Sequence, residues 1–554
     1  MEASPVHIIQ YFNGTKQGVI PLFQRPYSWE QRDWETLWLD LMAQYEEEGR
    51  GSHFMGAVVS VPVNSVPVGV TKHLVIDGQQ RLTTLSLLLA AIREACFSSG
   101  DTLTAGIIED FLINRHYSSP DDLKIVPTQV DRDAYNALVY RKNTASFEEC
   151  RILQAYRFFL RKLGGKDDDD QPIAAAQVLQ AIQQSLQVVM INLSTTDDPY
   201  LIFESLNHKG KPLSQSDLVR NYVLMRFQHS TSVGGEQETV YQELWRPMED
   251  ALKENMSEFL RHYGMRKGTN VRKGDIYTAS KSEFEKLKDA ADVRTRLGEM
   301  KIAALSYEKF LKPDLEANPR ISRRLGALQE LDSTVFYPLL LRLYRSWQND
   351  ELSSDGLVDS LDALESFYVR RMTCGVPTNA LNKIAMEICT HLPETSIDTW
   401  LRDKLGQGSG GRRWPQDDEF QDALVVQSIY TRRRLARYML IALEEAYEHK
   451  EPIDTTTATI EHIMPQTLNA TWKSDLGPEF SDIHERWLDT LGNLTLTGYN
   501  SELGNDPFDV KKTKLANTHF EMTKPVLENE KWGADEIKSR AASLASKAVM
   551  RWKR

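Results

Sequence analysis

Residues 75–85 read Val-Ile-Asp-Gly-Gln-Gln-Arg-Leu-Thr-Thr-Leu, and this stretch decides how the first part of the chain folds. The run 73–76 leading into it is apolar and β-branched, which is typical of a strand, and Asp77-Gly78 ends it as a turn. From Gln79 onward, apolar residues recur at the spacing of one helix face until a stop near Gly100. The sequence therefore predicts a strand that runs directly into a helix.

The same junction carries the residue types of an anion-binding site. Backbone N–H groups at a helix start attract negative charge, and Gly78 lets a ligand approach the backbone closely. Arg81 offers a fork-shaped contact to phosphate, and Asp77 can position a metal ion or a water. Gln79 and Gln80 can hold a base, a ribose or a phosphate. A plain Asp-Gly turn beside a salt-bridged arginine explains the same residues, so the pentapeptide alone leaves both interpretations open.

Two further segments accompany this junction. Residues 20–29 read Ile-Pro-Leu-Phe-Gln-Arg-Pro-Tyr-Ser-Trp and precede an expected helix. Within them Arg25 either packs against its aromatic neighbours as a cation–π corner or takes part in ligand recognition together with Gln24. The segment 203–218 contains a Gly-Lys-Pro turn, and Ser214 or Ser216 is expected to cap the helix that follows.

The length of 554 residues predicts two or three domains. The stretch 238–389 has an almost wholly helical pattern without a recurring unit, and the glycine-rich segment Gly406–Gly411 is a candidate boundary. We therefore expect an N-terminal domain at 1–225, a helical middle at 226–395 and a C-terminal domain at 396–554.

The composition excludes several classes of protein. The formal net charge of -12 argues against a chain that coats nucleic acid indiscriminately, although local basic clusters are present. The four cysteines form no Cys-x-x-Cys pair, so neither a disulfide framework nor a thiolate zinc site is indicated. The longest apolar stretch is far below the roughly 20 residues that span a bilayer, and no basic leader opens the chain. A cytoplasmic location without a membrane partner is expected.

The C-terminal part contains two segments with a different chemistry. Residues 460–466 read Ile-Glu-His-Ile-Met-Pro-Gln, and residues 492–496 read Gly-Asn-Leu-Thr-Leu. One-metal hydrolysis of a phosphodiester requires a base that activates water, a hard cation near the leaving oxygen, and a group that fixes the orientation of the base. The two segments supply all three kinds of residue.

Each role has a candidate in these segments or shortly after them. His462 is the expected general base, and Asn493 is expected to hold it through backbone or side-chain hydrogen bonds. Glu461 and Asn500 are the expected metal ligands, with Asn505 as an alternative to Asn500. Carboxylate and amide oxygens favour Mg²⁺ or Mn²⁺ over softer metals. A lone Glu-His pair is usually structural, so the assignment depends on the ordered combination.

Two lysines follow these segments. Lys511 and Lys512 are expected to contact the DNA backbone, because a cutting enzyme must hold phosphates before it attacks one.

The ordered N-terminal motifs resemble the ParB-like N-terminal domain of the GmrSD type IV restriction enzymes and of related SspE-type defence proteins. The C-terminal segments resemble the HNH-like nuclease domain of the same GmrSD proteins. The resemblance implies an α+β, predominantly helical fold. It would consist of an N-terminal ParB/sulfiredoxin-like domain, a helical middle with a junction helix around 364–375, and a C-terminal ββα-metal (HNH-like) nuclease domain.

The resemblance also implies cofactors and site residues. The N-terminal domain would bind and hydrolyse a nucleoside triphosphate, with GTP, UTP, CTP and ATP all remaining open. Its nucleotide site would comprise the junction residues and two residues of the preceding segment, namely Asp77, Gly78, Gln79, Gln80, Arg81, Gln24 and Arg25. Asn207, Lys209 and Asp217 belong to the third motif without a defined role. Glu461 departs from the more common aspartate, which leaves the metal preference open.

The sequence therefore predicts a nucleotide-regulated DNA endonuclease or nickase that senses modified DNA in anti-phage restriction. Its expected partners are double-stranded DNA, in modified form, and a nucleotide. A homodimer or successive nicks would allow one nuclease site to cut both strands. The alternatives are an NTP-gated DNA-binding clamp without cleavage and a toxin-like RNase.

Overall fold

The structure is a computed structural model of the chain, and it divides into two compact units. One unit comprises residues 1–250 and 276–298, and the other comprises residues 251–275 and 299–554. Each unit is described by itself, and the predicted division into three domains remains a prediction. The structure describes residues 2–21, 24–46, 52–63, 69–119, 121–193, 214–227, 235–447, 454–498 and 500–554.

The first unit contains a mixed six-stranded sheet with the order β1-β6-β3-β4-β2-β5. β1 pairs antiparallel with β6 and β3 pairs antiparallel with β4, whereas β6–β3, β4–β2 and β2–β5 are parallel pairs. The strands are β1 (Glu2–His7), β2 (Lys16–Val19), β3 (His53–Val63), β4 (Thr71–Asp77), β5 (Ile125–Val126) and β6 (Leu186–Asn192). The predicted strands at 54–63, 73–76 and 188–193 are confirmed within one or two residues.

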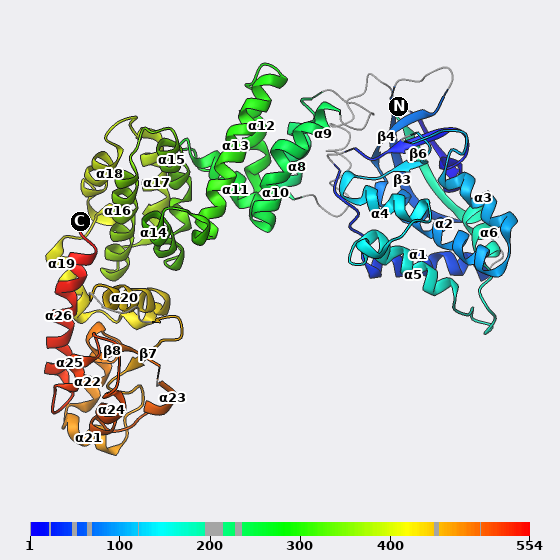
Figure 1. Ribbon diagram of the computed structural model, residues 1–554. Coiled ribbons are helices and arrows are strands. Elements are labelled where there is room, and N and C mark those ends of the chain that lie inside the picture. The colour runs from blue at the N-terminus through cyan, green and yellow to red at the C-terminus, as the bar shows by residue number, and fades with distance from the viewer. Residues whose placement is uncertain are drawn as a thin grey trace. The chain divides into compact units, whose positions relative to one another are not determined.

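Helix α2 is the central helix of this unit and packs against α3, α5 and α6 (Figure 1). It starts directly after β4 and ends at Gly100, whose φ of 83° is the left-handed conformation that favours glycine. By length and composition it is the one helix among the described residues that could cross a membrane, but 72% of its apolar window is buried inside the protein. The helices of the unit are α1 (Gln31–Glu46), α2 (Gln79–Ser99), α3 (Thr102–Leu112), α4 (Gln129–Val139), α5 (Arg151–Leu163), α6 (Ala175–Ser185), α8 (Gln215–Leu224), α9 (Glu236–Val240) and α12 (Ile276–Phe284).

The sequence patterns that predicted these helices are explained by burial and capping. The apolar stripe of α1 faces the core of the unit through Trp34, Leu37, Trp38 and Leu41. Ser214 caps α8 and forms a capping box with Asp217, so the first of the two predicted capping residues is confirmed.

The second unit is mostly helical, as the sequence predicts for 238–389. α10 (Arg246–Leu252) and α13 (Ala290–Leu311) contribute residues to both units. The helices of the second unit are α11 (Met256–Met265), α14 (Pro319–Glu330), α15 (Tyr337–Gln348), α16 (Ser354–Thr373), α17 (Leu381–His391), α18 (Ile397–Gly406), α19 (Asp417–Val426), α20 (Arg433–Glu445), α21 (Ala470–Leu476), α22 (Phe480–Trp487), α23 (Asn500–Leu503), α24 (Phe508–Leu515), α25 (Lys524–Leu527) and α26 (Ala534–Arg551). Its described strands are β7 (Thr459–His462) and β8 (Leu494–Thr497). The chain is thus α+β and predominantly helical.

Helix α16 ties the helical part of this unit to the end of the chain. Arg370 is buried, and its Nε donates a hydrogen bond of 2.8 Å to the carbonyl of Trp552. Trp552 Nε1 in turn donates to the buried carboxylate of Glu365 at 2.6 Å. Arg371 donates to the Gly411 carbonyl at 3.0 Å, so the predicted boundary at Gly406–Gly411 lies within this unit. These two arginines of the expected junction helix are therefore buried rather than solvated.

His262 on α11 gives the second unit a pH-dependent stability. The buried neutral ring accepts a hydrogen bond from Arg261 Nη2 at Nε2 (2.8 Å) and lies 2.9 Å from the Tyr307 hydroxyl at Nδ1. Burial, with the nearby Arg261 charge, lowers the pKa of His262 from 6.5 to about 3. Because the unfolded chain binds a proton below pH 6.5 and the folded protein does not, stability falls as the pH decreases toward about 3.

We expect His262 alone to remove about 2–3 kcal/mol of unfolding free energy between pH 6.5 and about 4.5. Urea unfolding of the full chain and of His262→Gln at several pH values measures this contribution as the difference between the two pH dependences. Identical pH dependences would show that the ring is not held neutral.

Candidate active site

The strand-to-helix junction of the first unit is built around Gly78. This residue has a φ of 88° between the end of β4 and the start of α2, and its N–H donates to Asp77 Oδ1 at 2.8 Å. A Cβ added there would lie 2.9 Å from a methyl group of Val58. The sharp entry into α2 therefore requires glycine, and it leaves the N-terminus of a long helix beside Asp77.

Two glutamines of the predicted nucleotide site hold the segment 24–28 against this junction. Gln80 Oε1 accepts a hydrogen bond from the Ser28 N–H (2.8 Å), and its Nε2 donates to the Pro26 carbonyl (3.3 Å). Gln24 is buried, and its Nε2 donates to the Ile76 carbonyl at 2.9 Å. The structure thus brings the two sequence motifs together, and these amide groups are used in joining them.

The other polar groups of the junction have different environments. Arg81 is half-buried, and its Nη1 donates to the Ala57 carbonyl at 2.7 Å. Gln79 is 7% exposed, and its Oε1 is a buried acceptor that has no hydrogen-bond partner among the residues that the structure describes. Arg25 is half-buried, and no cation–π contact with its aromatic neighbours is formed among the described residues. Gln79 and Arg81 therefore keep the most capacity for a ligand. Asn207 and Lys209 of the third motif lie outside the described residues.

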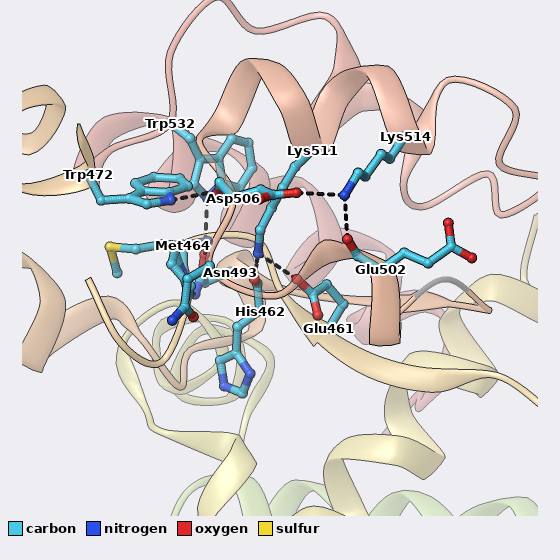
Figure 2. A network of polar contacts seen from close by, with 12 residues as sticks. Glu461, His462, Met464, Trp472, Asn493, Glu502, Asp506, Lys511, Lys514 and Trp532 are labelled. Carbon is cyan, nitrogen blue, oxygen red and sulfur yellow. Dashed lines mark hydrogen bonds and ion pairs between the residues drawn. The ribbon is translucent and has the colours of Figure 1, made fainter. Parts of the chain in front are cut away.

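In the second unit, β7 and β8 form an antiparallel ribbon that carries the C-terminal motif. Asn493 is fully buried just before β8, and Figure 2 shows it beside Met464 and Trp532. Its Oδ1 accepts from Met464 N (2.7 Å) and Trp532 Nε1 (3.0 Å), and its Nδ2 donates to the carbonyls of Met464 (3.0 Å) and Leu488 (2.9 Å). Asn493 thus fixes the chain directly after His462, and its side-chain hydrogen bonds in the described part of the chain go to Met464, Leu488 and Trp532 rather than to the imidazole.

The imidazole of His462 is oriented by a carboxylate. Its Nε2 lies 3.0 Å from Asp489 Oδ1, and the ring is 6% exposed. An ionised carboxylate accepts the hydrogen bond, so Nε2 carries the proton and Nδ1 keeps its lone pair. Nδ1 makes no hydrogen bond with the described residues. It is also not among the unpartnered side-chain atoms that are fully buried, so solvent reaches it. This arrangement leaves a basic nitrogen available to a water molecule.

Electrostatics keep this ring neutral. Burial lowers the pKa of His462, the Asp489 carboxylate partly offsets that effect, and the charges of Lys511 and His484 lower it further. The Tyr430 ring covers the imidazole edge-on at a centroid distance of 4.4 Å. A ring that stays unprotonated near neutral pH has the protonation state that a general base needs.

Glu461 points away from the His462 ring, because successive side chains of a strand lie on opposite faces. Its carboxylate, 5% exposed, forms a 2.5 Å ion pair with Lys511 Nζ, which also donates to the His462 carbonyl at 2.9 Å (Figure 2). Burial raises the pKa of Glu461 and lowers the pKa of Lys511. Lys511 is 1% exposed, and its ammonium group lies inside the protein beside Glu461. The predicted DNA contact of Lys511 remains a prediction.

The metal ligands predicted from the sequence can be compared with the described side chains only in part. No group of three or more His, Cys, Asp or Glu side chains gathers as metal ligands in the described part of the chain. The Glu461 carboxylate already faces an ammonium group, and the Asn500 side chain is not among those the structure describes. Asn505 is exposed, and Lys512 Nζ donates to the Asn529 carbonyl at 2.6 Å. The predicted ligand pair and the predicted DNA contact of Lys512 remain predictions.

Sequence reasoning missed two residues that the structure places at His462. Asp489 and Tyr430 come from different segments, and the Tyr430 N–H donates to the Asp489 carbonyl at 3.2 Å. The feature of the sequence that could have drawn attention to Tyr430 is the basic cluster 432–434, which begins two residues after it. No spacing rule links either residue to a histidine on a distant strand.

Comparison with known families matches two separate parts of the chain. Residues 8–224 match the N-terminal domain of GmrSD restriction endonucleases, and residues 414–547 match their C-terminal domain. The second match contains the ribbon, His462, Asp489 and Asn493. These findings define the class of the protein as a restriction-type DNA endonuclease.

The chain belongs to the GmrSD restriction endonuclease family. No curated protein matches it.

Proposed function

We propose that this endonuclease cuts DNA with His462 as the general base. The observation that carries the proposal is the Asp489 carboxylate on Nε2, which leaves Nδ1 free to accept a proton from water. The oxygen of that water forms a bond to phosphorus, and the bond from phosphorus to the leaving oxygen breaks. Asp489 orients the imidazole and stabilises its protonated form, and Asn493 holds the loop that follows.

The proposal includes regulation by a nucleotide at the junction of β4 and α2. Its support is the N-terminus of a long helix beside Gly78, the guanidinium of Arg81 and the buried acceptor of Gln79, which has no partner in the described part of the chain. Gln80 and Gln24 would act by holding the neighbouring segment in place. Family membership and the motif order support the sensing of modified DNA, nicking or double-strand cutting, and a requirement for Mg²⁺ or Mn²⁺.

One cleavage experiment tests this function. Plain, base-modified and backbone-modified duplexes of the same sequence are incubated with the full chain, with and without each nucleoside triphosphate, in Mg²⁺, Mn²⁺ or EDTA. We expect cutting of one modified duplex only, in the presence of a divalent ion, at a rate that depends on one nucleotide. Arg81→Ala should lose the response to the nucleotide.

The alternatives give different results in the same experiment. A DNA-binding clamp would retain the duplex without cutting it under any condition. A toxin-like RNase would degrade a structured RNA and leave all three duplexes intact. Either result would contradict the proposed function.

A further inference from the structure

An exposed arginine lies next to the histidine site without an assigned role. Arg433 is the first residue of α20, and its guanidinium carbon lies 5.2 Å from the centre of the Tyr430 ring. Its side chain is exposed, and it makes no hydrogen bond or ion pair with the residues that the structure describes. All its guanidinium donors are therefore available to a ligand.

The flanking arginines are used within the protein. Arg432 donates to the Met372 carbonyl. Arg434 donates to the Gln329 carbonyl at 2.7 Å and lies 3.5 Å from the Asp332 carboxylate. In the basic cluster 432–434, Arg432 and Arg434 therefore bind other parts of the protein, and the guanidinium of Arg433 stays available to a ligand. The sequence of the cluster does not show this difference.

Tyr430 connects Arg433 rigidly to the histidine. The Tyr430 ring meets the His462 ring edge-on, and its backbone N–H donates to the Asp489 carbonyl. Ser428 forms an isolated antiparallel bridge with Thr490 next to that bond. The segment that leads into α20 is therefore fixed to the same stretch of chain that orients His462.

The distances limit where a ligand of Arg433 can lie. The Arg433-to-Tyr430 and Tyr430-to-His462 distances are 5.2 and 4.4 Å, so the guanidinium is no more than their sum, 9.6 Å, from the imidazole centre. Each nucleotide advances a strand by about 3.4 Å along a duplex. Arg433 therefore reaches the phosphate at His462 or one within roughly three nucleotides of it.

The negative charge of Asp489 beside His462 favours a cation on the side of the imidazole. A phosphodiester that approaches the imidazole also approaches the Asp489 carboxylate, which repels it. Lys511 is buried on the other face of β7, where its charge is paired with the Glu461 carboxylate. Arg433 provides positive charge on the side where the imidazole lies.

We propose that Arg433 binds a backbone phosphate of the nucleic acid strand and positions that strand across His462. The cation–π contact with Tyr430 keeps the guanidinium beside that ring, and its N–H donors can form a fork-shaped contact with phosphate oxygens. The inference rests on the proposed role of His462 in cutting, and it adds the residue that holds the substrate there.

DNA binding by the full chain tests this contact. Binding of a labelled duplex is measured by anisotropy over a range of NaCl concentrations in the His462→Ala background, where cutting does not interfere. Adding Arg433→Ala should weaken binding by about tenfold at low salt and lower the slope of log Kd against log salt by about 1. Arg433→Lys should keep most of the salt slope, because it keeps the charge.

Arg486→Ala is the matched control, because Arg486 is also exposed and makes a cation–π contact, with its guanidinium carbon 5.1 Å from the Trp487 ring centre. It should leave the affinity and the slope unchanged. In the chain with His462 intact, Arg433→Ala should raise KM for cutting by about tenfold and change kcat much less.

The proposal would be overturned if Arg433→Ala bound DNA with the same affinity and the same salt slope as the His462→Ala parent. An equal loss of affinity in Arg486→Ala would also overturn it, as would a His462→Ala parent that does not bind DNA. If the parent binds DNA but the chain with His462 intact never cuts, the proposed function fails. The binding data for Arg433 then still decide the phosphate contact.

Discussion

Replacement of His462 by alanine is expected to slow DNA cleavage by roughly 10²- to 10⁴-fold, the usual contribution of a general base. The imidazole is the group whose free nitrogen can accept the proton of the attacking water, and Asp489 fixes its orientation. The measurement is the initial rate of cutting of the preferred duplex, with duplex binding determined in parallel. Binding should change little, because His462 is 6% exposed and contributes little contact surface.

The control for this variant is His519→Ala. His519 is an exposed histidine of the same unit, and its replacement should leave the cleavage rate unchanged. An unchanged rate in His462→Ala would refute the catalytic assignment.

The pH dependence of cutting separates the roles of His462 and Asp489. Since burial lowers the pKa of His462, the neutral base persists below pH 6.5, and the rate should fall only as the pH passes through the lowered pKa. Asp489→Asn removes the negative charge that raises this pKa, so the fall should move to still lower pH. The maximal rate should decrease as well, because a neutral amide no longer enforces the tautomer with the proton on Nε2. A fall that moves to higher pH in Asp489→Asn would contradict the geometry.

Replacement of Lys511 by methionine is expected to destabilise the second unit by about 3–5 kcal/mol, because it leaves the Glu461 carboxylate buried without its partner. Urea unfolding of the full chain measures the loss. The double variant Glu461→Leu with Lys511→Met removes both charges and should recover most of the stability.

Lys512→Met is the matched control on the same helix. Lys512 is half-buried and donates to one carbonyl, so its loss should cost about 1 kcal/mol. The alternative role of Lys511 as a DNA contact predicts the reverse pattern, in which Lys511→Met unfolds normally but binds DNA more weakly with a lower salt slope.

Local elements were predictable because their causes are local. The turn at Asp77-Gly78, the helix after it and the cap at Ser214 follow from backbone preferences and apolar spacing within a few residues. The predicted division into three domains remains a prediction, and the two compact units do not follow its boundaries. The helical middle belongs partly to each compact unit, and the glycine-rich segment at 406–411 lies inside one of them. Packing between distant helices decides such boundaries, and no local pattern reports it.

The sequence by itself determined the predominantly helical α+β character of this protein, its family and the histidine on which cutting is proposed to depend. Only the tertiary structure decided which groups meet that histidine. In the sequence Glu461 is its neighbour, but the alternation of side chains along β7 turns the carboxylate away to Lys511. Asp489 and Tyr430 reach the ring instead, because folding pairs their segments at the edge of the ribbon.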